Sequence, residues 1–207
     1  MKAESKTTTV GITTGSYVVL AADKRATAGA AIYHKDVRKI SKVNERAALT
    51  ISGLVADAQF IVENARFFAK KYEVSTGRAL SISSLANYLS LTLSLYLRVY
   101  PFIVQLLLGG YDKEGPSLYY LDLYGTVTKE KYAATGSGSP IALGVLESGY
   151  RENLPVEDAV NLAARAVTSA LGRDSFSGEG VDVLVIGKDG VLKEETIKFK
   201  KALEPLT

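Results

Sequence analysis

The sequence predicts an α+β fold in which two antiparallel sheets stack face to face and pairs of helices cover their outer sides. Short runs of β-favouring residues follow one another with turn signals between them, which is typical of hairpins. The helical patterns come in pairs and do not alternate singly with strands, which excludes a doubly wound parallel sheet. Stacked sheets between helix pairs would bury both kinds of apolar pattern.

Strand signals and then helix signals occupy the first half of the chain. Gly15-Ser16 separates two runs rich in valine, isoleucine and threonine, and suits a hairpin turn. After Gly53, apolar residues recur at helical spacing, and Pro101 closes the second helical stretch. These signals predict strands over residues 9–14, 17–22 and 47–52, and helices around residues 61–72 and over 82–99.

The same order of signals returns in the second half. Ser139 supplies a helix N-cap before Pro140, and Gly149 is a plausible terminator. Another helix opens after Pro155, and Lys188-Asp189-Gly190 indicates a hairpin. We expect strands over residues 103–111, 117–123, 126–133, 181–186 and 191–197, and helices over 140–149 and after 155.

The composition fits one globular domain. The chain has 207 residues, 47% hydrophobic and 23% charged, which is enough for one sizeable core. Its formal charge of +3 is spread without a basic stripe, so we expect no nucleic-acid partner. Residues 80–97 are apolar but interrupted by serine, threonine and asparagine, which predicts a buried helix and no membrane partner. The absence of cysteine fits a cytoplasmic location.

Few of the usual catalytic groups occur in this sequence. His34 is the only histidine and stands in a polar stretch, so we expect it at the surface and expect no serine–histidine–aspartate triad. With one histidine and no cysteine, the usual zinc sites are excluded, and no G-x-x-x-x-G-K-[ST] phosphate loop occurs. We therefore expect no metal and no other cofactor.

The threonine run at residues 7–9 offers another kind of nucleophile. A threonine that begins a chain can pass its hydroxyl proton to its own amine, whose pKa is about 7.7 to 8.0. A neighbouring lysine lowers that pKa, and a buried carboxylate holds the lysine in place. Thr7, Lys39 and Asp23 are candidates for these roles. The run could also be no more than the entry to an edge strand.

Six stretches of the sequence, taken together, carry a specific resemblance. They are Thr-Thr-Thr-Val-Gly-Ile-Thr from Thr7, Asp23-Lys24-Arg25, Lys39 between arginine and isoleucine, residues 51–59, Gly-Ser-Gly-Ser-Pro at 136–140 and Arg-Asp-Ser-Phe-Ser-Gly at 173–178. In this order, and over nearly the whole chain from Thr7 onward, they resemble the β subunit of the proteasome core particle of the archaeal type.

The resemblance implies an N-terminal-nucleophile hydrolase, a four-layer αββα sandwich and no cofactor. Residues 1–6 would be a short propeptide and residues 7–207 a single domain. Such β subunits form heptameric rings with other β subunits, stacked between rings of α subunits on which a regulatory ATPase docks. The implied substrate is unfolded polypeptide.

The resemblance also implies a role for each site residue. Once the bond between Lys6 and Thr7 is cut, the Thr7 hydroxyl would attack the scissile carbonyl with its freed amine as base. Lys39 would tune that amine, Asp23 would pair with Lys39, and the Gly53 N–H would bind the oxyanion. Three further residues would surround the amine and orient water: Ser137, Asp174 and Ser177.

Seven other positions match residues that bind substrate in this family. Thr27 would bind the substrate backbone as an added strand. The pocket for the side chain before the cut would be lined by Ala26, Val37, Ser41, Ile51, Val55 and Gln59. None of these six is charged and Ile51 gives an apolar floor, so we expect a preference for hydrophobic or aromatic residues at that position.

Two alternatives stay open at the level of sequence. Active members usually carry glycine before the catalytic threonine, and this chain has Lys6. The subunit could therefore be mainly structural, remaining uncleaved or being cleaved only beside a different, active β subunit. The other alternative is the related bacterial ring protease that works with an unfolding ATPase. The paired helices predicted between residues 57 and 99 favour the proteasome.

Overall fold

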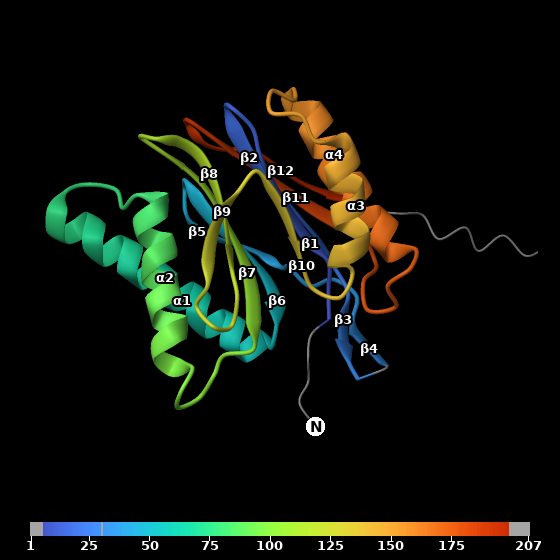
Figure 1. Cartoon of the computed structure of the whole chain (residues 1–207), viewed down its shortest axis with the longest axis horizontal. Helices are drawn as coiled ribbons and strands as arrows, with labels where there is room; N and C mark the ends of the chain where they lie inside the picture. The colour runs from blue at the N-terminus through green and yellow to red at the C-terminus, as the bar shows by residue number, and fades with distance from the viewer. Residues whose placement is uncertain (1–5, 30, 199–207) are drawn as a thin grey trace, which may run out of the picture.

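Two five-stranded antiparallel sheets stack face to face, and two helices cover the outer side of each sheet (Figure 1). This computed structural model describes residues 6–29 and 31–198. The four layers confirm the predicted α+β class and the αββα sandwich. The predicted propeptide lies outside the described residues except for Lys6.

The first sheet has the strand order β10-β1-β2-β11-β12. Its strands are β1 (Thr9–Thr13), β2 (Tyr17–Asp23), β10 (Tyr132–Thr135), β11 (Val181–Gly187) and β12 (Gly190–Ile197). β1 pairs with β10 on one side and with β2 on the other, and Thr9 lies opposite both Thr135 and Ala22. The threonine run therefore enters the interior of a sheet and not its edge.

The second sheet has the order β5-β6-β7-β8-β9, and a two-stranded sheet of β3 and β4 lies apart from both. Its strands are β5 (Ile40–Asn44), β6 (Ala47–Gly53), β7 (Val104–Asp112), β8 (Gly115–Leu121) and β9 (Val127–Glu130). The small hairpin consists of β3 (Ala26–Ala28) and β4 (Ala31–His34). β3 begins three residues after Asp23, so the hairpin leaves the first sheet at the end of β2.

The four helices pack in pairs, as their apolar patterns predicted. They are α1 (Val55–Thr76), α2 (Ile82–Tyr96), α3 (Ser139–Gly149) and α4 (Val156–Leu171). One apolar cluster joins α1 and α2 to the second sheet, and another joins α3 and α4 to the first sheet. Small side chains on one face of α4 are buried in that second cluster: Ala159, Ala163, Ala166 and Val167.

A third apolar cluster lies between the two sheets. Its buried members come from strands of both sheets: Val18, Leu20, Ala48, Leu107, Leu118, Ala133, Leu184 and Ile186. A polar contact also crosses the layers, because the hydroxyl of Thr9 on β1 lies 2.9 Å from that of Thr50 on β6. This contact brings the start of β1 close to the end of β6, where Gly53 lies.

Several local predictions were wrong. The run 126–133 is not one strand: β9 and β10 belong to different sheets, and the chain changes sheet at Lys131. Ser139 is the first residue of α3 and not its N-cap, which is Gly138. The strands β3, β4 and β5 were not predicted, because their residues lack a long apolar run.

α2 is buried on one side only. Its inner face is buried, with Leu85, Leu89 and Leu93 in the cluster below, whereas Leu91 and Leu95 are exposed. The prediction of a buried helix therefore holds for half of its surface. Among the residues that the structure describes, no helix combines the length and the apolar character needed to span a bilayer.

Candidate active site

Thr7 lies two residues before β1, at the end of the sheet where α3 begins. Its side chain has no exposed surface, and its carbonyl accepts hydrogen bonds from the Gly138 N–H at 3.3 Å and the Ser137 hydroxyl at 3.4 Å. Gly136 has φ +90°, and a Cβ there would collide with the Thr7 carbonyl. The glycine–serine loop before α3 therefore fits closely around the backbone of Thr7.

Asp23, the last residue of β2, is the acceptor at the centre of the site. The antiparallel pairing of β1 and β2 places it beside Thr8, whose carbonyl accepts a bond from the Asp23 N–H at 3.1 Å. One carboxylate oxygen, Oδ1, accepts from the Thr8 N–H at 3.0 Å and from the Thr7 hydroxyl. The other oxygen, Oδ2, accepts from the N–H groups of Arg25 at 3.0 Å and Gly178 at 2.9 Å. These bonds fix both the position and the orientation of a fully buried carboxylate.

Lys39 enters the site from the other sheet, one residue before β5. Its ammonium nitrogen lies 2.6 Å from Asp23 Oδ1 and 2.6 Å from the Arg25 carbonyl oxygen, and it also donates to the Thr7 hydroxyl oxygen. The side chain is buried, and burial lowers the pKa of Lys39 although the charge of Asp23 acts to raise it. The Thr7 hydroxyl therefore contacts both members of a buried ion pair.

A second set of polar residues reaches the site from the loop after α4. One oxygen of Asp174 accepts from the Ser137 hydroxyl at 2.8 Å and from the Ser177 hydroxyl at 2.6 Å. The Ser177 hydroxyl also lies 2.7 Å from that of Thr8. The three predicted residues thus form one network beside the backbone of residues 7 and 8.

Gly53 ends β6 with a backbone that other residues rarely adopt. Its φ is +119°, and a Cβ at this position would collide with the Ile103 carbonyl oxygen, which also accepts the Leu54 N–H at 2.8 Å. The backbone here is therefore both left-handed and tightly enclosed. Glycine at this position has a structural reason independent of any oxyanion role.

The predicted substrate-binding residues come from several elements. Thr27 on β3 is buried, and its hydroxyl has no hydrogen-bond partner among residues 6–29 and 31–198. The Ile51 N–H donates to the Lys39 carbonyl at 2.9 Å, which places Ile51 directly beside the site. Ala26, Val37 and Ser41 are partly buried nearby in the chain, whereas Val55 and Gln59 are exposed at the start of α1.

Four contacts at the site were not predicted. The Gly178 N–H donates to the Asp23 carboxylate, the Thr8 and Ser177 hydroxyls are hydrogen-bonded, and the Gly138 N–H donates to the Thr7 carbonyl. The fourth contact is made by the Arg25 side chain. Arg25 donates to the Ser175 carbonyl at 2.9 Å and to Glu179 at 3.0 Å, and so connects the end of β2 to the loop after α4. The Asp-Lys-Arg triplet was the available sequence signal for Arg25.

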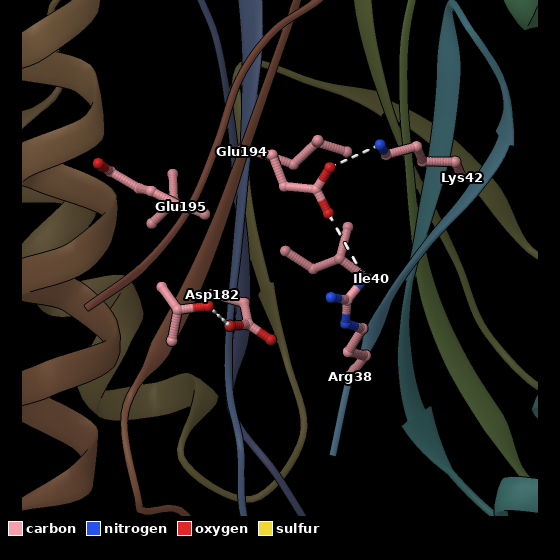
Figure 2. Close-up of a pocket in the computed structure, with 9 residues that line it drawn as sticks. Arg38, Ile40, Lys42, Asp182, Glu194 and Glu195 are labelled. Atoms are coloured by element: carbon pink, nitrogen blue, oxygen red, sulfur yellow. Dashed lines mark hydrogen bonds and ion pairs between the residues drawn. The ribbon is translucent and has the colours of Figure 1, made fainter. Parts of the chain in front are cut away.

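A pocket of about 390 Å³ lies beside the segment that carries Lys39, on the side facing away from Thr7 (Figure 2). Successive side chains of an extended chain point to opposite sides, so Arg38, Ile40 and Lys42 line the pocket while Lys39 points to Thr7. In Figure 2, the Glu194 carboxylate lies between Arg38 and Lys42. One of its oxygens is 3.8 Å from Arg38 Nη1, and the other is 2.5 Å from Lys42 Nζ. None of the predicted catalytic residues lines this pocket, so it is separate from the candidate site.

Comparison with known proteins identifies the family. The family model described as "Proteasome subunit" matches residues 4–186. The chain is 64% identical over 203 residues to "Proteasome subunit beta 2" of Desulfurococcus amylolyticus, covering 98% of each chain. It is 57% identical to the protein of the same name from Staphylothermus marinus over 98% of this chain and 97% of the other, and 51% identical to that of Hyperthermus butylicus over 99% and 95%.

The chain belongs to the archaeal proteasome β-subunit family. The resemblance inferred from the six motifs is therefore confirmed, and the bacterial ring protease is not supported. As a proteasome β subunit, the chain assembles with other subunits into the core particle, and its family is one of threonine peptidases.

Before any cleavage, Lys6 and Thr7 are joined by a peptide bond. The Thr7 nitrogen is an amide here, which cannot act as a base. The Thr7 hydroxyl, by contrast, already contacts Asp23 and Lys39. The hydroxyl, the lysine and the carboxylate that the sequence selected therefore lie in contact with one another.

Proposed function

We propose that this β subunit is a threonine endopeptidase of the proteasome core particle, activated by removal of the residues before Thr7. The observation that carries this proposal is the contact of the buried Thr7 hydroxyl with both Asp23 and Lys39. A purely structural subunit has no need for a buried lysine and carboxylate on one hydroxyl, because burying charges is costly.

The first reaction would be cleavage of the subunit's own chain. The Thr7 oxygen adds to the carbonyl carbon of Lys6 while its proton leaves toward the Lys39–Asp23 pair. The bond from that carbon to the Thr7 nitrogen breaks, the nitrogen takes up a proton as an amine, and the preceding residues remain as an ester on Thr7. Water then cleaves the ester, giving a carboxylic acid at Lys6 and the free Thr7 hydroxyl.

In the mature subunit the same hydroxyl would attack unfolded polypeptide, with the new amine as general base. Lys39 would keep that amine unprotonated by its charge, and Asp23 would hold Lys39. Gly53 would give its N–H to the oxyanion, and the network of Ser137, Asp174 and Ser177 would orient water. These roles accord with the placement of the Asp174 network beside residues 7 and 8.

Substrate preference would follow from the residues beside Lys39. Thr27, whose buried hydroxyl has no hydrogen-bond partner in the part of the chain that the structure describes, would bind the substrate backbone. Ile51 would form the apolar floor of a pocket with Ala26, Val37, Ser41, Val55 and Gln59, favouring hydrophobic residues before the cut. Peptides with leucine or tyrosine at that position should be cleaved faster than peptides with glutamate or arginine, because a charged side chain loses its hydration there.

We further propose heptameric rings of β subunits between rings of α subunits, with an ATPase docked on the α rings in the cytoplasm. Residues 7–207 would form a single domain after a propeptide. The three relatives described above all carry the number 2 in their names, which is in keeping with more than one type of β subunit.

A second candidate function is that of a mainly structural subunit. Lys6 favours it, because a side chain before the threonine restricts the backbone that self-cleavage has to distort. In that case the chain would remain uncleaved in its particle, or would be cleaved only beside an active β subunit.

Intact mass and peptide hydrolysis of the assembled particle test this choice. The wild-type subunit should begin at Thr7 after assembly and cleave a fluorogenic hydrophobic peptide, whereas Thr7→Ala should remain uncleaved and inactive. Thr7→Ser, which keeps a hydroxyl, is the matched control and should retain cleavage. A wild-type chain that stays uncleaved and inactive with every companion β subunit would support the structural role.

A further inference from the structure

The loop after α4 forms a platform that is tied to the nucleophile. Its Ser177 hydroxyl bonds to Thr8, its Gly178 N–H bonds to Asp23, and its Asp174 bonds to Ser137 in the loop around Thr7. The Arg25 side chain also holds the Ser175 carbonyl. Any side chain that this loop carries is therefore placed accurately relative to the bond before Thr7.

Phe176 is the aromatic residue on this platform, and it contacts Lys6. The Lys6 ammonium nitrogen lies 4.2 Å from the centre of the Phe176 ring, well within the range of about 6 Å for a cation–π interaction. Both side chains are partly buried, which strengthens such a contact by removing water. Within residues 6–29 and 31–198, Lys6 forms no ion pair with a carboxylate. In this part of the chain, the charged group of Lys6 therefore interacts with the Phe176 ring.

We propose that Phe176 is a positioning residue for removal of the propeptide: its ring holds the side chain of Lys6 and thereby holds the bond between Lys6 and Thr7 against the Thr7 hydroxyl. This inference rests on the proposed endopeptidase function. It assigns a role to Phe176 that is separate from the hydrolysis of substrates, in which the Lys6 side chain takes no part.

The contact offers a physical reason why lysine can stand before the nucleophile. Glycine at that position lets the backbone adopt the shape needed for attack, but it has no side chain by which the enzyme can hold it. Lysine restricts the backbone more, and its ammonium group on Phe176 fixes the far end of the same residue. Holding the reacting groups at contact distance lowers the entropic part of the barrier.

The cleavage that this contact would assist is the one described above. The Thr7 oxygen bonds to the carbonyl carbon of Lys6, the bond to the Thr7 nitrogen breaks, and the nitrogen gains a proton. Water completes the reaction by releasing the propeptide with a carboxylic acid at Lys6. No other reactant is needed.

The test follows the rate of processing in particles assembled with α subunits and companion β subunits. Intact mass, sampled over time after assembly, gives the fraction of chains that begin at Thr7. The variants are Phe176→Leu, Lys6→Gln and their combination, with Phe176→Tyr and Lys6→Arg as conservative replacements. Phe67→Leu is the matched control, because on α1 the ring of Phe67 also lies near a lysine, with Lys71 5.9 Å away.

We expect Phe176→Leu and Lys6→Gln each to slow processing by about two- to thirtyfold, the range that corresponds to one cation–π contact. The combined variant should be no slower than the slower single variant, because both remove the same contact. Phe176→Tyr, Lys6→Arg and Phe67→Leu should stay within about twofold of the wild type, since the first two keep a ring and a cation in contact.

Additive effects of the two substitutions, or unchanged rates, would overturn the role of Phe176. A chain produced to begin directly at Thr7, without any propeptide, distinguishes this failure from failure of the proposed function. If that chain cleaves hydrophobic peptides but the full chain is never processed, the positioning role is wrong. If even that chain is inactive in the particle, the endopeptidase function itself is wrong.

Discussion

Asp23 accepts more hydrogen bonds than any other side chain of the candidate site. Backbone N–H groups from three separate segments donate to its carboxylate, together with Thr7 and Lys39. Lys39, which is buried beside Asp23, forms an ion pair with this carboxylate. The position of Thr7 therefore depends on one carboxylate.

Asp23→Asn should destabilise the subunit strongly. The NH₂ group of asparagine would replace an oxygen that now accepts hydrogen bonds, and the buried Lys39 would lose its negatively charged partner. We therefore expect a loss of about 3 to 5 kcal/mol in the free energy of unfolding. Denaturant unfolding measures this loss. Asp189→Asn, on an exposed turn, is the control and should stay within about 0.5 kcal/mol of the wild type. Equal stability of the two variants would contradict the central role of Asp23.

The lowered pKa of Lys39 should make stability depend on pH in the alkaline range. Burial, the largest cause, brings the pKa below 10.5 in the folded chain, so that chain releases its proton at a lower pH than the unfolded chain does. Between the two pKa values the unfolded chain binds more protons, and the contribution of Lys39 to the free energy of unfolding therefore rises with pH.

Lys39→Arg provides the comparison for this pH dependence. Arginine stays charged throughout this range, so the variant should lack the rise. The measurement is denaturant unfolding of both chains at several pH values up to 10.5. Parallel curves for the two chains would show that Lys39 does not titrate in this range.

At the scale of elements, the site is assembled from loops at the ends of strands and helices. The glycine–serine loop before α3, the loop after α4 and the segment before β5 all meet at the start of β1. Glycine at position 136 permits one of these close approaches, since a Cβ there would collide with the Thr7 carbonyl. The first two segments join the first sheet to the layer of α3 and α4, and the third leads into the second sheet, so the site depends on the layers being correctly stacked.

Gly136→Ala should damage the site, whereas Gly144→Ala should not. A Cβ at 136 meets the Thr7 carbonyl and the backbone has φ +90°, so we expect a loss of about 1 to 3 kcal/mol in stability and a failure of processing. Gly144 lies inside α3 with open space around it, and alanine there should add about 0.5 to 1 kcal/mol. Thermal unfolding and intact mass measure both effects, and similar outcomes for the two variants would contradict this account.

Local patterns predicted most elements but not their partners. The hairpin around Gly15-Ser16 and the helix after Pro155 follow from turn chemistry and helical spacing, and both are present. The division of residues 126–133 into β9 and β10 could not be predicted, because it depends on pairing: β9 pairs with the preceding strand β8, whereas β10 pairs with β1 at the start of the chain. Which sheet a strand joins is decided by contacts between segments of the folded chain and not by the local sequence.

The candidate site shows the same limit. The chemistry of a hydroxyl, a lysine and a carboxylate was enough to select Thr7, Lys39 and Asp23, and the structure brings these three together. The Gly178 N–H on Asp23 could not be predicted, because it comes from 155 positions along the chain and a backbone donor has no sequence signal.

At the scale of the whole molecule, three apolar clusters fill the spaces between four layers. Leu118 belongs to the cluster between the sheets, and Leu89 to the cluster under α1 and α2. Each of the two five-stranded sheets contributes to the central cluster and to one outer cluster, so loss of one layer exposes the next. We therefore expect the layers to unfold together.

Leu118→Ala and Leu89→Ala should each lower the same unfolding transition. Both side chains are fully buried, and each truncation should cost about 2 to 5 kcal/mol, with the combined variant losing close to the sum. Calorimetry should show one transition throughout, as expected for a single domain. Leu95→Ala, at a side chain that is 74% exposed, should have little effect. Two separate transitions, each sensitive to one substitution, would contradict a single cooperative unit.

The hydrogen bonds to the backbone of Thr7 affect what kind of chain end the proposed cleavage would create. Chain termini usually fray, because nothing holds their backbone. Here the Thr7 carbonyl is bound by Gly138 and Ser137, and the next N–H by Asp23, before any bond is cut. The conformational entropy of this terminus is thus already lost on folding. The new amino group would remain where it is formed, so no search by a mobile end would precede each round of catalysis.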